Sequence, residues 1–532
     1  MSDSRRRFLQ EAATGLTFAA FTGQPSARAA DAPATFNVRT LGAAGDGKTI
    51  DSPAIDKAIA AASSAGGGTV LFPAGKYLCY TLHLKSNVVL YLDQGAVILA
   101  APSPMPGDTN TNAYDLAEPN QWDKFQDYGH SHWRNSLIWG EGVENVSILG
   151  PGLIWGKGLS NGRNEAGANN PRAEQAGVGN KAIALKNCHN ITLRDFSILQ
   201  GGHFAILATG ADNFTVDNLK FDTDRDAIDI DCCKNVRVSN CVVNSPWDDG
   251  ICPKSSFALG VAKPTEYVTI TNCYVTGAYE MGTVLDGTYK KFPAEMRNPR
   301  NGRIKFGTES NGGFRNITIS NCVFDSCQGL ALESVDGALL EDIAITNISM
   351  RDIVNMPIFL RLGSRMRGPA GAAVGTLRRI LISNIVCSNS AVRAASIISG
   401  IPGHRIEDVK LSDILIQHRG GGTAADAAAR PQEFETKYPE PTMFGATPSH
   451  GFYFRHVLGL SLSNVEIVAE KEDARPAFYL DDVQDCDFAR IKTPSNPAAG
   501  TFVLKGVEDF TLTHCKTAPD THLDKADDKK IG

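Results

Sequence analysis

The stretches NITLRDFSIL (190–199), NFTVDNLKFD (213–222) and NVRVSNCVV (235–243) decide the fold of this chain. Each alternates apolar and polar residues with period two and is rich in Ile, Val, Leu and Thr, which is the pattern of a half-buried β-strand. Their first residues lie 23 and 22 positions apart, a spacing that suits one coil of a solenoid. The Asn that opens each stretch can cap a backbone turn and stack on the next coil. The three stretches therefore predict successive coils of one repeating architecture.

The same pattern recurs along most of the chain, without helical segments between the strands that could serve as βαβ crossovers. We therefore expect an all-β protein, a single right-handed parallel β-helix over residues 31–532. Residues 52–63 have helical spacing and are expected to form a helix that caps the N-terminal end. Further copies of the strand pattern are NVSILG (145–150), YVTITNCYV (267–275), NITISNCVF (316–324), DIAITNISM (342–350), RILISNIVC (379–387), DVKLSDILI (408–416), LSLSNVEIV (460–468) and DFTLTHCKT (509–517).

Composition narrows the class of partner. The chain has 532 residues, 42% hydrophobic and 21% charged, so neither disorder nor a membrane bundle fits. The 52 Lys and Arg residues against 58 Asp and Glu residues give a net charge of -6, which argues against nucleic acid as the main partner. Twelve Cys residues are too sparse for a disulfide scaffold, and neither a metal motif nor a cofactor motif is seen. We expect a monomer that needs no cofactor.

The first 30 residues have the pattern of an export signal. SRRRFLQ (4–10) resembles a bacterial twin-arginine signal, an Ala-rich stretch follows it, and an A-x-A cleavage pattern falls at residues 27–29. The apolar stretch is too short to span a bilayer. The expected location is therefore the periplasm or the outside of the cell.

Three carboxylates are spaced to meet in one cleft. Asp226 and Asp248 lie 22 residues apart, about one coil, so they should stand on neighbouring rungs roughly 4.8 Å apart. Asp249 adds a third carboxylate. Crowded carboxylates repel, which raises at least one pKa and keeps a proton available for an acid step. This is what glycoside hydrolysis requires, because one acid protonates the leaving oxygen while another activates water. The neighbouring Asp222, Asp229 and Asp231 are interpreted as solvated turn positions.

The chain resembles glycoside hydrolase family 28, the polygalacturonase family, over residues 36–515. Residues 224–229 (DRDAID) match the family's NTDGID motif with its third-position Asp kept, and the family's DD motif is intact at 248–249. Lys254 and Ser255 stand in the usual KS position, and GTESNGGFRNI (307–317), which contains Glu309, resembles the GSE-x-x-GG-x-RN stretch. The resemblance implies hydrolysis of an α-glycosidic bond in the pectin backbone. It implies that Asp248 is the general acid while Asp226 and Asp249 activate water, with inversion at the anomeric carbon.

The chain departs from the family pattern at two places. No His stands near residues 301–303, where the family has one, and Arg303 or Lys305 is the candidate for its ordering role. The family's RIK motif aligns with residues 331–333, so Glu333 replaces a Lys that holds a uronate carboxylate. Such a Glu repels a uronate and favours a neutral sugar.

Other candidates for substrate binding are less specific. His203 lies one rung before Asp226, and Arg361 or Arg365 is placed to supply the missing positive charge. Trp122, Trp133 and Trp247 are possible platforms for sugar rings. The long insertions at 104–135, 157–180 and 418–450 are of the kind that builds a binding site. Three alternatives to the polygalacturonase interpretation stay open at this point: a rhamnogalacturonan-directed hydrolase, a pectate lyase and a non-catalytic carbohydrate-binding β-helix.

Overall fold

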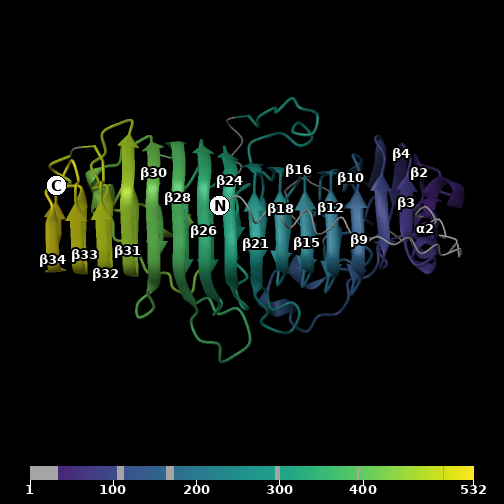
Figure 1. The fold of residues 1–532 in the computed structure, drawn as a ribbon, viewed down its shortest axis with the longest axis horizontal. Helices are drawn as coiled ribbons and strands as arrows, with labels where there is room; N and C mark the ends of the chain where they lie inside the picture. Colours follow the sequence, from purple (N-terminus) through teal and green to yellow (C-terminus); the bar gives the residue numbers. More distant parts are fainter. Residues whose placement is uncertain (1–33, 105–112, 163–172, 294–299, 392–394, 495) are drawn as a thin grey trace, which may run out of the picture.

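The computed structural model describes residues 34–104, 113–162, 173–293, 300–391, 395–494 and 496–532. The predicted export signal at 1–30 lies outside these residues. The described chain is a long rod of stacked parallel strands, with helix α2 (Ser52–Ser64) at one end and strand β34 (Thr521–Ala526) at the other (Figure 1). The predicted all-β fold, a parallel β-helix, is confirmed. Within the described residues, no helix has the length and apolarity needed to cross a membrane.

One sheet of the rod carries the predicted catalytic residues. Its strands are short, two to six residues each, because each coil bends sharply after them. Strands β14, β17 and β20 pair in parallel register, with Leu207 beside Asp229 and Asp229 beside Cys252. In chain order the strands of this sheet are β5 (Leu82–His83), β8 (Ser136–Glu141), β11 (Lys181–Lys186), β14 (Phe204–Thr209), β17 (Asp226–Asp231) and β20 (Ile251–Lys254). A parallel bridge between Ile251 and Ile304 leads to a further series of parallel strands, which belongs to the larger sheet of the rod. This series consists of β23 (Lys305–Phe306), β25 (Leu330–Ser334), β27 (Ile358–Leu362), β29 (Ser396–Ser399) and the first residues of β31 (Phe452–Ala469), β32 (Phe478–Ala489) and β33 (Phe502–Thr513).

The other faces of the rod include the strands that the sequence pattern predicts from residue 87 onward. The apolar residues of each repeat point inwards and form one continuous core along the rod. These strands are β1 (Thr35–Asn37), β2 (Asp46–Ile50), β3 (Gly68–Phe72), β4 (Gly75–Cys79), β6 (Val88–Leu92), β7 (Ala96–Ala100), β9 (Glu144–Leu149), β10 (Leu153–Trp155), β12 (His189–Arg194), β13 (Ser197–Leu199), β15 (Asp212–Asp217), β16 (Lys220–Asp222), β18 (Lys234–Ser239), β19 (Val242–Asn244), β21 (Thr265–Thr271), β22 (Tyr274–Thr276), β24 (Phe314–Asp325), β26 (Leu339–Arg351), β28 (Thr376–Ser390) and β30 (Ile406–His418).

Asparagine shapes the turns, as predicted. Asn190 and Asn213 both adopt positive φ angles, 55° and 54°, a left-handed conformation that Asn tolerates better than most residues. Their side chains also form a ladder along the rod. Asn213 Nδ2 donates to Asn190 Oδ1 at 2.6 Å, and Asn190 Nδ2 donates to Asn145 Oδ1 at 3.0 Å. The recurring Asn therefore turns the chain and fixes the stacking of the coils.

Both ends of the rod are covered. Helix α2 (Ser52–Ser64) buries Ile55, Ile59 and Ala62 against the first coil, which is the spacing that predicts it. At the other end, β34 (Thr521–Ala526) and β35 (Lys529–Ile531) lie antiparallel on β33. Covering the ends removes the open sheet edges that a solenoid would otherwise expose. The remaining short helices are η1 (Val38–Leu41), η2 (Asp123–Phe125), η3 (Tyr128–Ser131), α3 (Ala424–Ala427) and η4 (Pro441–Phe444).

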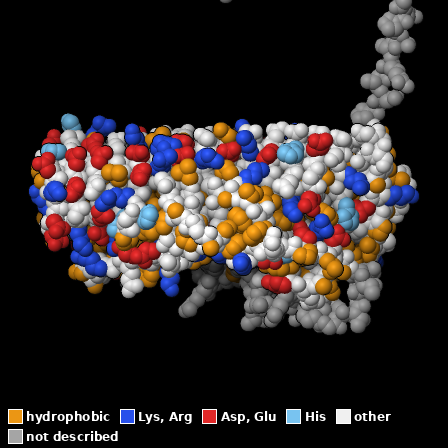
Figure 2. Space-filling view, turned by 90° about the horizontal axis from the view of Figure 1, so that it is seen from below, with side chains coloured by type: hydrophobic (Ala, Val, Ile, Leu, Met, Phe, Trp, Pro, Cys, Tyr) orange, Lys and Arg blue, Asp and Glu red, His pale blue; other side chains and the backbone are white. Residues whose placement is uncertain are grey.

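Neither sign of charge dominates the face shown in Figure 2, and the cysteines form no disulfides. Figure 2 shows one long face of the rod, on which acidic and basic side chains are interspersed rather than separated by sign. This mixture agrees with the small net charge of -6. All twelve cysteines are free thiols, and all but Cys515 are buried. The stability of the rod therefore comes from stacking and core packing rather than from disulfides.

Candidate active site

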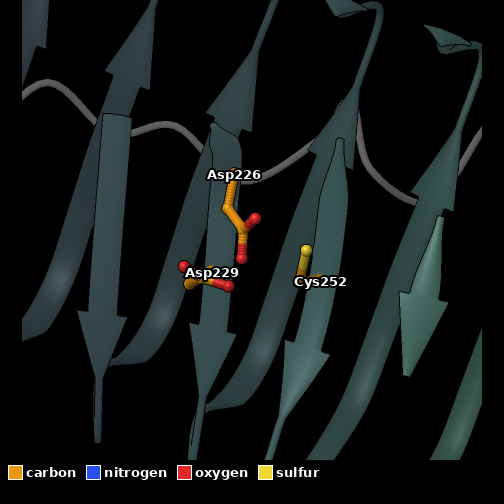
Figure 3. A group of neighbouring side chains, drawn as sticks. All are labelled: Asp226, Asp229 and Cys252. Carbon is orange, nitrogen blue, oxygen red and sulfur yellow. The ribbon is translucent and has the colours of Figure 1, made fainter. Parts of the chain in front are cut away.

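Carboxylates gather on the outer side of β17 and on the turn before β20. Figure 3 shows Asp226 and Asp229 projecting from one strand, with Cys252 on the next. The N–H of Ala227 donates to the carbonyl oxygen of Asp249 at 3.3 Å, which brings the Asp248–Asp249 turn beside Asp226. Asp226 and Asp249 are at most 4% exposed. The structure thus brings the three predicted catalytic carboxylates together, with Asp226 and Asp249 buried and the side chain of Asp248 23% exposed.

Lys254 is the cation at the centre of this group. Its Nζ lies 3.7 Å from Asp226 Oδ2, 3.7 Å from Asp229 Oδ1 and 3.3 Å from Glu309 Oε2. The side chains of all four residues are almost completely buried, so solvent screens these charges little. Lys254 therefore balances part of the negative charge that the carboxylates concentrate here.

The pKa values of Asp226 and Asp248 shift in opposite directions. Burial and the neighbouring charges of Asp248 and Asp229 raise the pKa of Asp226 well above its usual range. Burial also disfavours ionisation of Asp248, but the Arg225 guanidinium and a hydrogen bond from Asp226 outweigh it and hold the pKa of Asp248 below its usual range. These opposite shifts favour Asp226 as the holder of a shared proton, and an acid step requires such a proton. Family resemblance implies a protonated Asp248, whereas the resting structure favours its ionised form because Arg225 faces it.

Arg225 is the residue that polarises this pair. Its Nε and Nη2 both lie 3.0 Å from Asp248 Oδ2, and its Nη1 lies 2.8 Å from His203 Nε2. His203 Nε2 also lies 2.9 Å from Asp127 Oδ2. Burial, followed by the charge of Arg225, lowers the pKa of His203 to about 4, so this imidazole is neutral at pH 7. His203 thus lies next to Arg225 in the site and helps to orient it.

A second group surrounds Asp249. Arg303 is fully buried, and its Nε donates to Asp249 Oδ1 at 2.8 Å. Lys305 Nζ lies 3.3 Å from Asp249 Oδ2. Glu440, from the 418–450 insertion, accepts from Arg303 Nη2 at 2.6 Å and lies 3.5 Å from Lys305 Nζ. Both residues that were predicted to replace the family's His therefore contact Asp249 directly.

Glu309 anchors the far side of Lys254. Burial alone would raise the pKa of Glu309, but Lys254, His130 and the Arg367 guanidinium that bonds it lower that pKa well below its usual range. The ring of His130, which lies in η3, is 3.7 Å from Glu309 Oε2 and stacks on Phe204 at a centroid distance of 4.5 Å. Glu309 is thus a permanently charged counterion of the site.

Glu333 and Arg361 lie on neighbouring strands but have different surroundings. Glu333 is fully buried, its oxygens accept no hydrogen bond, and burial raises its pKa to about 8. Its charged neighbour is Lys305, at 3.8 Å. Arg361 donates instead to the backbone oxygens of Gly400 and Glu433, at 2.9 and 2.7 Å. Arg361 therefore holds the 418–450 insertion, and its role towards substrate stays a prediction.

The remaining sequence candidates have mixed positions. Arg365 bonds Asp336 at 2.9 Å, and Trp133 is buried, with its Nε1 donating to Thr209 at 3.0 Å. Trp133 is therefore a packing residue rather than a sugar platform.

The interpretation of Asp222, Asp229 and Asp231 as solvated turn positions is wrong. All three are 0% exposed, because Asp222 accepts hydrogen bonds from Asn244, Gly282 and Val284, Asp231 accepts them from Ser256, and Asp229 pairs with Lys254.

One group in the described residues has the geometry of a metal site. One ligand atom each from Asp226, Asp229 and Cys252 lies within 4.8 Å of the others. The Lys254 ammonium lies 3.7 Å from both carboxylates and occupies the position of a counterion. Burial also raises the pKa of the Cys252 thiol well above its usual range, whereas a metal ligand is a thiolate. These residues fit a protonated carboxyl pair with a lysine better than they fit a bound cation.

Removing the charge of Arg225 tests the polarisation of the acid pair. In Arg225→Gln both carboxyls lose a stabilising cation, so their pKa values rise and both limbs of the pH profile of kcat/KM move to higher pH, by about one unit. Arg225→Lys keeps the charge and should stay within roughly half a unit of the wild type. An unchanged or acid-shifted profile in Arg225→Gln would contradict the assignment.

The structure shows a parallel β-helix that carries a cluster of carboxylates on one face. The family model described as rhamnogalacturonase A/epimerase, pectate lyase-like, matches residues 35–252. The chain is therefore similar to this family over the matched residues, which make up less than half of its length.

Individual relatives are similar to parts of this chain. A probable polygalacturonase of Vitis vinifera is 22% identical over 306 residues, which cover 52% of this chain and 58% of that protein. Mannuronan C5-epimerase AlgE1 of Azotobacter vinelandii is 60% identical over 45 residues, 8% of this chain and 3% of that protein. The chain thus spans less than two thirds of either relative. The crystal structure of a hyperthermoactive exopolygalacturonase from Thermotoga maritima has a TM-score of 0.57 at 16% identity, covers 94% of this chain and 95% of its own, and bears on the fold alone.

Proposed function

We propose that the protein is an inverting glycoside hydrolase that cleaves an α-glycosidic bond in the backbone of pectin. The observation that carries this proposal is the cluster of Asp226, Asp248 and Asp249, in which the pKa of Asp226 is raised and the pKa of Asp248 is lowered. In the reaction the shared proton passes to the leaving glycosidic oxygen through Asp248. Asp249, with Asp226 once it has given up its proton, then accepts a proton from the attacking water.

The names of two relatives describe enzymes that act on polymers of galacturonic acid. They are the polygalacturonase of Vitis vinifera and an exo-poly-alpha-D-galacturonosidase of Dickeya chrysanthemi. The expected partner is therefore a pectic polysaccharide or oligosaccharide. Export through the twin-arginine signal would place the protein in the periplasm or outside the cell, where such polymers occur.

A rhamnogalacturonan-directed hydrolase is the second candidate. The specific observations in its favour are Glu333, which replaces a uronate-binding Lys, and the rhamnogalacturonase description of the matching family model. A neutral rhamnose beside the scissile bond tolerates a buried carboxyl group better than a uronate does.

Product release from homogalacturonan and from rhamnogalacturonan I, measured with a chelator present, tests the proposal. New reducing ends without ultraviolet-absorbing unsaturated products are expected, and the polymer that responds identifies the backbone. An unsaturated product would point to a lyase, and the absence of product from both polymers and their oligosaccharides would overturn the proposal.

A further inference from the structure

Two buried cations lie beside Asp249. A carboxylate of the 418–450 insertion, which lies outside the coils of the β-helix, neutralises part of their charge. Arg303 and Lys305 stand on the coil that carries β23, with side chains 0% and 3% exposed. The β-helix offers them Asp249, at 2.8 and 3.3 Å, and Glu333, at 3.8 Å from Lys305. The third carboxylate is Glu440, at 2.6 Å from Arg303 and 3.5 Å from Lys305.

The charges of this group balance only when Glu440 is counted. Burial raises the pKa of Glu333 to about 8, so Glu333 is mostly neutral at pH 7 and compensates little. Two positive charges then face the negative charges of Asp249 and Glu440. Without Glu440 the group would keep one excess positive charge in a buried place, which is an anion site. Arg303 Nη1, buried and without a hydrogen-bond partner, is a further donor in this group.

Glu440 lies where a ligand can compete with it. Its side chain is 29% exposed, while the cations beneath it are buried. Tyr438 belongs to the same segment, is 52% exposed, and places its hydroxyl 3.3 Å from Lys305 Nζ. The segment is anchored elsewhere, because Phe444 packs on Phe359 of the sheet. Glu440 is therefore not needed to hold the insertion on the rod.

We propose that Glu440 occupies the carboxylate position beside Asp249 and thereby sets the specificity of that subsite for a sugar without a charged carboxylate. This inference rests on the proposed function and names the chemical class that this subsite takes: a neutral hexose, a deoxyhexose, or a uronate whose carboxyl is methyl-esterified. An ionised uronate would have to displace Glu440 from Arg303 and Lys305, or leave two carboxylates side by side.

The test compares oligogalacturonides with the same oligomers after methyl esterification, so that only the charge differs. For the wild type, KM should be lower for the ester. In Glu440→Gln, KM for the free acid should fall about tenfold and become sensitive to salt, while KM for the ester stays within about twofold. Glu435→Gln is the matched control, because Glu435 lies in the same insertion but pairs with neither cation in the described structure. Equal changes for both substrates, or the same change in the control, would overturn the proposal.

Binding separates a failure of this inference from a failure of the proposed function. Calorimetric titration with galacturonic acid and with galactose needs no turnover. Glu440→Gln should bind the acid more tightly than the wild type does and bind galactose equally well. If the wild type hydrolyses no pectic polymer but this binding pattern holds, the proposed function fails and the subsite assignment stands. If turnover is seen and the pattern is missing, the subsite assignment alone is wrong.

Discussion

Asp248→Asn should lose turnover by about three orders of magnitude while keeping its affinity for oligosaccharide, because an amide neither holds the transferable proton nor bears the compensating charge. The neutral amide also removes the partner of Arg225, which lies 3.0 Å away. The measurement is kcat on the responsive pectic polymer, together with the dissociation constant for its oligomers.

Asp509→Asn is the control for Asp248→Asn. Asp509 is exposed on a distant coil and has a φ of 51°, a conformation that Asn accepts, so this variant should behave as the wild type. A carbohydrate-binding protein without catalysis would show unchanged behaviour in both variants. Full turnover in Asp248→Asn would therefore remove this residue from the mechanism.

Lys254→Met should lose both stability and turnover. The ammonium lies within 3.7 Å of three buried carboxyl groups, and removing one partner of a buried pair costs about 3–5 kcal/mol of unfolding free energy. The pKa values of Asp226 and Asp229 would rise further without this cation, so the carboxylates could not ionise in the reaction. We expect kcat to fall at least about a hundredfold. Unfolding in urea and kcat below the transition measure the two effects separately.

Arg475→Met deletes a buried cation far from the site and serves as the matched comparison. Arg475 binds Asp473 through two bonds of 2.9 and 2.8 Å, and neither side chain is more than 2% exposed. Its loss should cost a similar unfolding free energy, about 3–5 kcal/mol, but leave kcat within roughly twofold. If Arg475→Met also abolished turnover, the effect of Lys254→Met could not be ascribed to the active site.

The repeat made the fold predictable. Period-two strands at intervals of 22 and 23 residues, each opened by Asn, place the core, the turns and the direction of stacking without knowledge of any distant contact. The same spacing brought Asp226 and the Asp248–Asp249 turn to neighbouring rungs, and the structure joins them through Ala227. Interactions along the rod follow from the period, because each residue meets the one a coil away.

The parts of the site that were missed lie outside this period. Glu440 lies in an insertion and contacts Arg303 and Lys305, which are 137 and 135 residues away in the sequence. Asp127 and His130 come from another long loop. No strand spacing specifies where such loops fold back. Arg225 was visible in the DRDAID stretch, where it replaces the family's Thr, and a buried Arg next to two acids is the signal that could have identified it. A buried carboxylate needs a cation nearby, as Glu309 has in Lys254, or hydrogen-bond donors, as Asp222 has in Asn244.

The most direct test of the central claim is the anomeric form of the first product. Proton NMR during hydrolysis of a purified α-linked pectic oligosaccharide should show the β-anomer first, with the α-anomer appearing later by mutarotation, because Asp226 and Asp249 direct water to the face opposite the leaving group. Initial release of the α-anomer, or of an unsaturated sugar, would contradict inverting hydrolysis by these carboxylates.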